Sequence, residues 1–321
     1  DALNTIDATT IDRHVRRWTA IGPRHADRPA AVAATLRYLT DCLTGYGYQV
    51  RPDRYGGGPH QVNLLAELPG TGDAPILELG AHWDTVVDSP GADDNASGVA
   101  GLLEVARVLR AAAPPARTLR FCLFAEEEDL EIGYLGSRAH VAGFDAAGFD
   151  AAGTPVAGAI VLEMIGYRDR TPGSQRLPAD VVPADSPLRV FDRGDFIAAI
   201  GNPGADGYLE AVRAAGQAQD PPLPVLPITL PVGPAGNGIR SDHYPYWLSG
   251  RPAVMVTDTA EFRNPHYHRP GDTVTTLDLD FPAAGPRAAA TRGQALSMVG
   301  TVSVLAASPP GGKTLQPSGA P

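Results

Sequence analysis

Residues 76–109 contain a short apolar run, a polar loop and an amphipathic segment in direct succession. The run ILELG, which starts at Ile76, has the length and the flanking glycine typical of a buried strand rather than a helix. From Val99 onward the spacing is helical, with apolar residues at Leu102, Leu103, Ala106 and Leu109. We therefore predict a strand, a loop at its carboxyl end, and a helix.

The rest of the chain repeats this alternation. Apolar runs predict further strands at 117–125, 156–165 and 252–257, and a short strand at 196–200 is followed by a helix at 208–215. Residues 1–44 have helical spacing, and 46–54 and 61–68 are expected to pair as antiparallel strands at a sheet edge. Strands alternating with helices imply βαβ units and a mainly parallel sheet.

These elements predict an α/β fold with a single domain at 1–307, in which a mixed, mostly parallel central sheet has helices on both faces. The segment 166–240 is rich in Pro and Gly, and we interpret it as an elaborated insertion of the same domain because no linker isolates it. A closing helix is expected at 287–306. The tail 308–321 has little to bury and is predicted to be mobile.

Composition excludes two classes of partner. The formal net charge of −10 disfavours a phosphate-binding surface, so no nucleic acid is expected. No apolar run approaches the ~20 residues of a membrane span.

The chain starts at Asp1 instead of Met, so we expect a removed leader or a shortened chain, and a soluble protein, secreted or cytoplasmic. Cys42 and Cys122 lie in apolar patterns and are interpreted as small buried side chains.

The loop after the first central strand contains one histidine and several aspartates. His82, Asp84, Asp93 and Asp94 all lie in it, and such a loop at the carboxyl end of a strand suits a divalent cation. The alternative is that Asp93 and Asp94 only cap the following helix by accepting hydrogen bonds from its free N–H groups. From this loop alone both interpretations stay open.

Other predicted strands are also followed by, or end near, acidic residues. The strand at 117–125 is followed by Glu126 and Glu127, and Glu163 lies near the end of the strand at 156–165. Parallel strands bring these ends to one edge of the sheet, where carboxylates repel each other unless a cation neutralises them. A set of His, Asp and Glu without a thiolate suits zinc or a similar ion, and the number of carboxylates is sufficient for two ions. In the Glu126 and Glu127 pair, one residue can bind metal while the other transfers a proton.

With these residues the sequence resembles the M28 zinc metallopeptidases, which include bacterial aminopeptidases. The resemblance runs from about residue 20 to residue 280 and keeps the family's motif order. The matching motifs are GAHWD (80–84), ADDNASG (92–98), FAEEE (124–128), LGS (135–137), LEMIGY (162–167), SDH (241–243) and PHYHRPGDT (265–273).

The resemblance implies a role for each matching residue. His82 and Glu163 would bind one zinc ion, and Asp94 would bridge two ions. The residues that remain are assigned as follows: Glu127 and His268 bind the second ion, Glu126 is the general base, Asp84 orients the His82 imidazole, and Tyr267 donates to the oxyanion.

The neighbouring polar residues are given lesser roles. Asp93 is expected to cap the helix or to support a ligand, and Glu128 to belong to a solvated acidic loop. His266 competes with His268 for one ligand position, and the family spacing favours His268. Asp242 and His243 are expected near the site without binding metal.

The implied function is hydrolysis of the N-terminal peptide bond of a peptide, or of a small amide, by a metal-bridged hydroxide, with acidic residues at the closed end of the pocket holding the free amine. Three rivals share the scaffold: a single-zinc cyclotransferase resembling glutaminyl cyclases, an amidohydrolase, and a carboxypeptidase. The last needs a cation for the substrate carboxylate, for which Arg193, Arg240 and Arg263 are candidates. A non-catalytic binding module is disfavoured because the whole ligand set is present. The sequence leaves the oligomeric state open.

Overall fold

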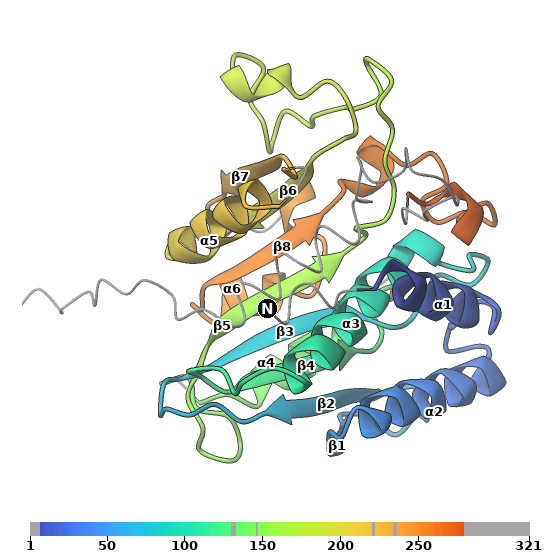
Figure 1. Ribbon diagram of the computed structural model, residues 1–321, viewed down its shortest axis with the longest axis vertical. Coiled ribbons are helices and arrows are strands. Elements are labelled where there is room, and N and C mark those ends of the chain that lie inside the picture. The colour runs from blue at the N-terminus through green and yellow to red at the C-terminus, as the bar shows by residue number, and fades with distance from the viewer. Residues whose placement is uncertain (1–6, 130–132, 146, 220–221, 234–235, 279–321) are drawn as a thin grey trace, which may run out of the picture.

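The computed structural model describes residues 7–129, 133–145, 147–219, 222–233 and 236–278, and within them eight strands form one mixed sheet (Figure 1). The order across the sheet is β1-β2-β4-β3-β5-β8-β6-β7. The predicted α/β fold is thereby confirmed. The strands are β1 (Val50–Arg54), β2 (Val62–Leu68), β3 (Ile76–His82), β4 (Leu119–Phe124), β5 (Val156–Glu163), β6 (Ile197–Gly201), β7 (Val225–Thr229) and β8 (Ala253–Thr257).

The centre of the sheet is parallel. Strand β3 pairs in parallel with β4 and β5, and β5 pairs in parallel with β8. Strands β3, β4 and β8 are buried along their whole length, as expected for parallel strands covered on both faces. At one side β2 and then β1 continue the sheet antiparallel, which confirms the predicted edge pair.

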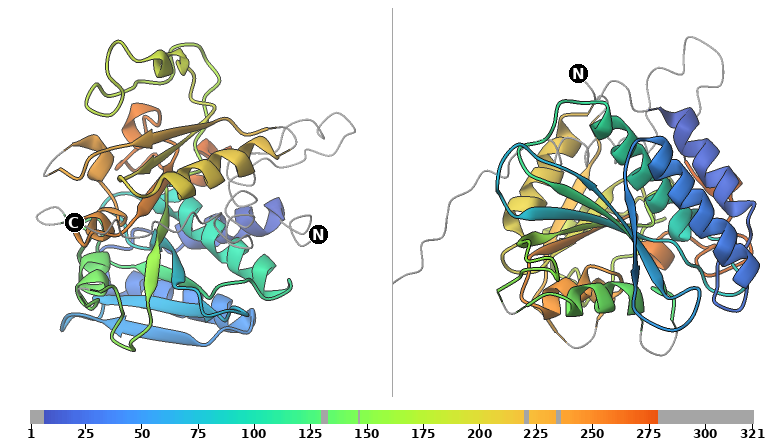
Figure 2. Two further views of the ribbon diagram at one scale, coloured as in Figure 1. Left: turned by 90° about the vertical axis from the view of Figure 1, so that its left-hand side faces the viewer. Right: turned by 90° about the horizontal axis from the view of Figure 1, so that it is seen from below.

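Helices cover both faces, as predicted (Figure 2). Trp18, Leu39 and Leu103 belong to the core on one face, whereas Tyr246 and Trp247 belong to a second core on the other. The first face carries α1 (Ala8–Thr19), α2 (Pro29–Gly45), α3 (Gly98–Arg110) and α5 (Asp206–Gln217), and the second carries α4 (Leu135–Ala142) and α6 (Tyr244–Leu248).

The predicted insertion contributes to the main sheet. Strand β6 pairs antiparallel with β8 and extends the sheet, and β7, which the sequence pattern did not indicate, pairs in parallel with β6. Between β5 and β6 the chain runs out beyond the sheet and returns, at the top of Figure 1. The predicted helix at 287–306 and tail at 308–321 lie outside the described residues. No helix within the described part of the chain is both long and apolar enough to cross a bilayer.

Candidate metal centre

Three neighbouring parallel strands deliver the candidate ligands to one edge of the sheet. Strand β3 ends at His82, β5 ends at Glu163, and the acidic run Glu126–Glu128 begins two residues after β4. Because β4, β3 and β5 are adjacent and parallel, their carboxyl ends meet. The fold therefore collects side chains that are up to 81 residues apart in sequence, as in the contact of His82 with Glu163.

Asp94 lies between two imidazoles and turns one carboxylate oxygen toward each. Its Oδ1 is 3.3 Å from His82 Nε2, and its Oδ2 is 3.2 Å from His268 Nε2. On the first side, Glu163 Oε1 is also 3.3 Å from His82 Nε2. On the second side, Glu128 Oε2 is 2.9 Å from His268 Nε2. Asp94 thus joins two groups of ligand atoms.

The backbone around Asp94 is fixed from both sides. The fully buried carboxylate of Asp272 accepts hydrogen bonds from the N–H groups of Asp93 at 2.9 Å and Asp94 at 3.1 Å. On the other side, Asn95 donates to the Leu162 carbonyl at 2.9 Å and so ties this loop to β5. These contacts hold the Asp94 carboxylate in place before any ligand binds.

Arg24 fixes the segment that precedes Asp94. Its guanidinium is completely buried and donates to the backbone carbonyls of Trp83 at 2.9 Å, Pro90 at 2.7 Å and Gly91 at 3.0 Å. Arg24 and Asp272 were not predicted as supporting residues. Their signal in the sequence is weak, because each acts on the backbone of a distant loop.

Asp84 has two connections to the site. Its Oδ1 is 3.5 Å from His82 Nδ1, in line with the orienting role that the resemblance implies. Both of its oxygens also accept backbone hydrogen bonds, from Glu127 N at 3.1 Å and Glu128 N at 3.0 Å. This carboxylate therefore holds the backbone of the acidic run that follows β4 and lies beside the His82 imidazole.

Within that run, the residue that contacts His268 lies one position after the one that the resemblance implies. Glu128, and not Glu127, makes the contact with His268. The interpretation of Glu128 as part of a solvated loop is wrong, because only 8% of the residue is exposed. Burial and the adjacent Asp94 carboxylate raise the pKa of Glu128 to about 8.

Glu126 and Glu127 also have surroundings that differ from those expected for their implied roles. Glu126, the expected base, accepts hydrogen bonds from Tyr55 Oη at 2.8 Å and Gln61 Nε2 at 3.3 Å, and its other oxygen lies 3.1 Å from His60. Glu127 instead lines a pocket together with Asp94 and Glu163. The φ of Glu126 is 52°, an uncommon value for a residue other than glycine.

The segment before α4 supports the acidic run. Gly136 N–H donates to the Ala125 carbonyl at 3.0 Å, and Leu135 N–H donates to the Glu126 carbonyl at 2.9 Å. A Cβ at Gly136 would lie only 2.3 Å from the Ala125 oxygen and 2.4 Å from Asn63 Oδ1. The glycine of the LGS motif is therefore required by this close approach.

The remaining sequence candidates lie around the site. Of the two histidines in the 265–273 motif, His268 lies in the cluster, whereas His266 makes an aromatic contact with Tyr167. Tyr267 stacks its ring on the His268 imidazole, with centroids 3.7 Å apart. His243 is fully buried and donates from Nε2 to the Gly238 carbonyl at 2.9 Å, which leaves it outside the cluster.

The electrostatics of the cluster fit bound cations. Burial alone would lower the pKa of His268, but ion pairs with Asp94 and Glu128 raise it to about 10. His268 Nε2 nevertheless makes no hydrogen bond to the described residues. It approaches the carboxylate oxygens of Asp94 and Glu128 without the alignment that a hydrogen bond needs.

The distances agree with this interpretation. Ligand atoms of His82, Asp94 and Glu128 lie within 4.8 Å of one another. Two atoms that share one zinc ion at about 2.0–2.1 Å with a tetrahedral angle lie about 3.3 Å apart. The observed separations of Asp94 from His82 and His268, 3.3 Å and 3.2 Å, match that value. The donor set therefore fits zinc.

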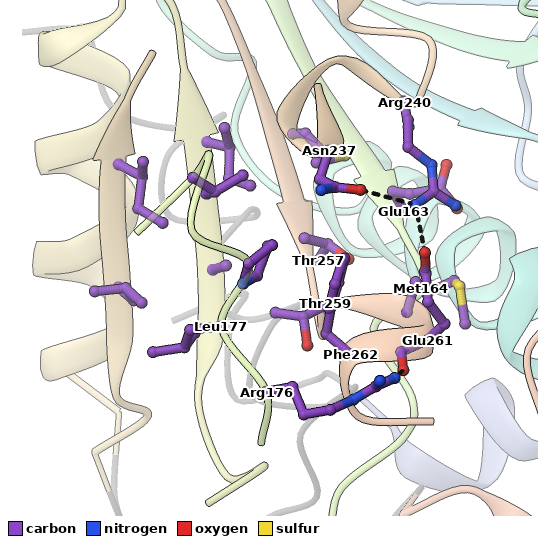
Figure 3. A pocket seen from close by; sticks show the side chains of 18 of the residues that line it. Glu163, Met164, Arg176, Leu177, Asn237, Arg240, Thr257, Thr259, Glu261 and Phe262 are labelled. Atoms are coloured by element: carbon purple, nitrogen blue, oxygen red, sulfur yellow. Dashed lines mark hydrogen bonds and ion pairs between the residues drawn. The ribbon is translucent and has the colours of Figure 1, made fainter. Parts of the chain in front are cut away.

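A pocket opens beside the cluster, with Glu163 at one end and Arg240 on its wall (Figure 3). Three acidic residues of the cluster region line it, namely Asp94, Glu127 and Glu163, and many of the other lining side chains are apolar. The apolar lining includes Leu177, Val182, Phe196, Ile200, Leu226 and Met255.

Comparison with known proteins agrees with this geometry. The sequence model of peptidase family M28 matches residues 63–192. YfbL of Escherichia coli (strain K12) is 37% identical over 282 residues, which cover 84% of this chain and 82% of that protein. The LapA aminopeptidase of Legionella pneumophila superposes with a TM-score of 0.69 at 21% identity and covers 96% of this chain and 73% of its own. Glutaminyl cyclase of Tannerella forsythia superposes with a TM-score of 0.64 at 22% identity, over 94% of this chain and 97% of its own.

The two solved structures show that this chain shares their fold. One of them is an aminopeptidase and the other a glutaminyl cyclase by name. The family match is more specific, because it contains β3, β4 and β5 and the loops that present His82, Asp94, Glu128 and Glu163. The similarity to YfbL extends over most of both chains. On these grounds the chain belongs to peptidase family M28, a family of zinc metallopeptidases.

Proposed function

We propose that this chain is a dinuclear zinc aminopeptidase. The observation that carries the proposal is the position of Asp94, with one oxygen toward His82 and the other toward His268. His82 and Glu163 would hold one ion, Glu128 and His268 the other, and Asp94 both. Zinc in such a site lowers the pKa of water and polarises a carbonyl group.

Glu127 takes the role of general base in this proposal, in place of Glu126. It lines the pocket beside Asp94 and Glu163, so its carboxylate can reach a water molecule and the scissile amide. Burial and the neighbouring Glu128 and Glu163 carboxylates raise the pKa of Glu127, which makes its carboxylate a stronger base. The same carboxyl group then returns the proton to the leaving amine.

The pocket favours an apolar N-terminal side chain over a C-terminal carboxylate. Its lining away from the cluster is aliphatic and aromatic. Of the arginines considered for a carboxypeptidase, Arg263 is 5% exposed and donates to the Phe196 carbonyl at 2.8 Å. Arg240 lines the pocket but is engaged by Glu261 and Tyr267.

A paired substitution tests the assignment. Glu127→Gln is expected to lower kcat by about a hundred- to ten-thousand-fold, because general acid-base catalysis contributes that much. The zinc content should stay at two ions per chain. Glu126→Gln is the matched control and should keep most of the activity. A larger loss in Glu126→Gln than in Glu127→Gln would contradict the proposal.

The substrate class needs a separate assay. Aminoacyl p-nitroanilides are expected to be cleaved, whereas N-blocked peptides are not, and a chelator should abolish turnover. A glutaminyl-cyclase-like activity would be distinguished by one zinc ion per chain and by a product that has lost ammonia instead of gaining water.

A further inference from the structure

Arg240 lines the pocket (Figure 3). It contacts Tyr267, whose ring stacks on the candidate ligand His268. Its Nη2 donates to Tyr267 Oη at 2.9 Å. Its Nη1 pairs with the Glu261 carboxylate and donates to Asn237 Oδ1 at 3.4 Å. The guanidinium is thus held from one side by Glu261 and Asn237, and presents its other N–H group to the phenol.

This hydrogen bond fixes the direction in which Tyr267 can donate. A guanidinium carries only donors, so the Tyr267 oxygen must act as the acceptor in the contact with Arg240. The hydroxyl proton therefore points away from Arg240 and is available to a group in the pocket, which Tyr267 also lines. A hydrogen bond from a cation also withdraws electron density from the phenol and makes it a stronger donor.

The phenol ring is held from its other side as well. It stacks on the His268 imidazole at 3.7 Å with an interplanar angle of 23°. A tyrosine hydroxyl carries its proton at neutral pH. A protonated phenol next to the candidate metal ligands, with its oxygen already occupied as an acceptor by Arg240, can act as a donor there.

We propose that Arg240 is a positioning residue, which orients the Tyr267 hydroxyl toward the oxygen that gains negative charge when the scissile carbonyl is attacked. This inference rests on the proposed peptidase function. It adds a residue that acts through Tyr267 and has no contact of its own with the reacting atoms.

Kinetics provide the first test. Tyr267→Phe is expected to lower kcat by about a hundredfold, the cost of removing one oxyanion donor. Arg240→Met should lower kcat by about tenfold and change KM by less than about twofold, because it weakens an interaction that is realised in the transition state. Arg240→Lys should recover part of the loss, since lysine keeps the charge without the planar fork. In the Tyr267→Phe background, Arg240→Met should cost less than about twofold.

Binding provides a readout that is independent of turnover. The zinc-loaded variants are titrated with an α-aminoalkyl boronic acid, which forms a tetrahedral adduct, and with the corresponding free amino acid. Arg240→Met should lose about tenfold in affinity for the boronic acid and little for the amino acid. Arg176→Met is the matched control, because Arg176 lines the same pocket but donates to the Glu261 backbone carbonyl and not to Tyr267. It should not show this selective loss.

The outcomes separate the two proposals. If the wild-type protein hydrolyses aminoacyl substrates but the Arg240→Met and Tyr267→Phe losses are additive, Arg240 does not act through Tyr267 and the inference is overturned. If the zinc-loaded wild-type protein neither cleaves these substrates nor binds the boronic acid, the proposed function fails and the inference fails with it. The side chain of Arg240 is 37% exposed, so its replacement should not prevent folding, and Arg240→Lys repeats the test if it does.

Discussion

Two buried clusters on the same sheet both combine histidine with carboxylates but are stabilised differently. The first is the candidate metal centre around Asp94. The second, which we call the inner network, consists of Glu78 on β3, Arg120 and Cys122 on β4, His140 on α4 and Tyr246 on α6. Both bring ligand atoms of a histidine and a carboxylate within 4.8 Å of those of a third residue.

The inner network is neutralised by the protein itself. Arg120 pairs with Glu78 at 2.7 Å and Asp150 at 2.6 Å. His140 uses both ring nitrogens, with Nδ1 3.1 Å from Asp53 and Nε2 3.1 Å from Glu78. Burial would raise the pKa of Glu78, but His140 and Arg120 lower it to about 2.

At the metal centre the balance is different. His268 Nε2 has no hydrogen-bond acceptor among the described residues, although oxygens of Asp94 and Glu128 lie 3.2 Å and 2.9 Å from it. A buried carboxylate is stable only when it is compensated. The two clusters both combine a histidine with carboxylates, but they differ in charge balance and hydrogen-bond alignment.

The largest expected effect concerns metal binding itself. His82→Ala should lose bound zinc and all measurable hydrolysis. The substitution removes the imidazole nitrogen Nε2, which lies beside Asp94 Oδ1 and is a candidate ligand atom. The matched change in the inner network, His140→Asn, should retain the zinc. Zinc per chain is measured by atomic absorption after dialysis. Loss of zinc from the His140 variant instead would reverse the comparison.

A smaller effect is expected on stability. Arg120→Met removes the cation that pairs with Glu78 and should lower the free energy of unfolding by about 3–5 kcal/mol, the usual cost of breaking a buried ion pair. Urea denaturation of the zinc-loaded protein measures this change. A value near zero would show that His140 and Tyr246 compensate Glu78 without Arg120.

The pH dependence of zinc binding should reveal the protons held at the metal centre. In the metal-free protein the pKa of His268 is raised to about 10, so zinc has to displace a proton from it at neutral pH. Affinity should therefore rise with pH, by about tenfold per pH unit for each proton released. Competition with a chelator at several pH values measures the slope. A flat profile would mean that the imidazoles are already neutral.

The smallest effect is expected from a single hydrogen bond of the inner network. Tyr246 donates to Glu78 Oε2, and Tyr246→Phe keeps the ring while removing the donor. The loss should be about 1.5 kcal/mol, typical of a hydrogen bond to a charged group. Thermal or urea unfolding measures it. A simultaneous loss of zinc would indicate that the two clusters are coupled along β3.

The sequence was sufficient where the chemistry coincides with regular structure. His82 and Glu163 are the last residues of β3 and β5, and the apolar patterns located those strand ends directly. It was not sufficient in the acidic run, because Glu126–Glu128 lie in an irregular loop with no side-chain period. There, Asp84 accepts a hydrogen bond from Glu128 N, and Glu128 contacts His268.

The amino-acid sequence by itself determined the α/β class, the parallel centre of the sheet, the family and the set of side chains from which the metal centre is drawn, because hydrophobic periodicity and motif order are local properties of the chain. Only the tertiary structure decided which carboxylates are compensated by the protein's own cations. That distinction depends on Arg120 meeting Glu78 across neighbouring strands, and on Asp94 meeting two histidines that are separated from it by loops. Such distances and alignments arise only once the chain has folded.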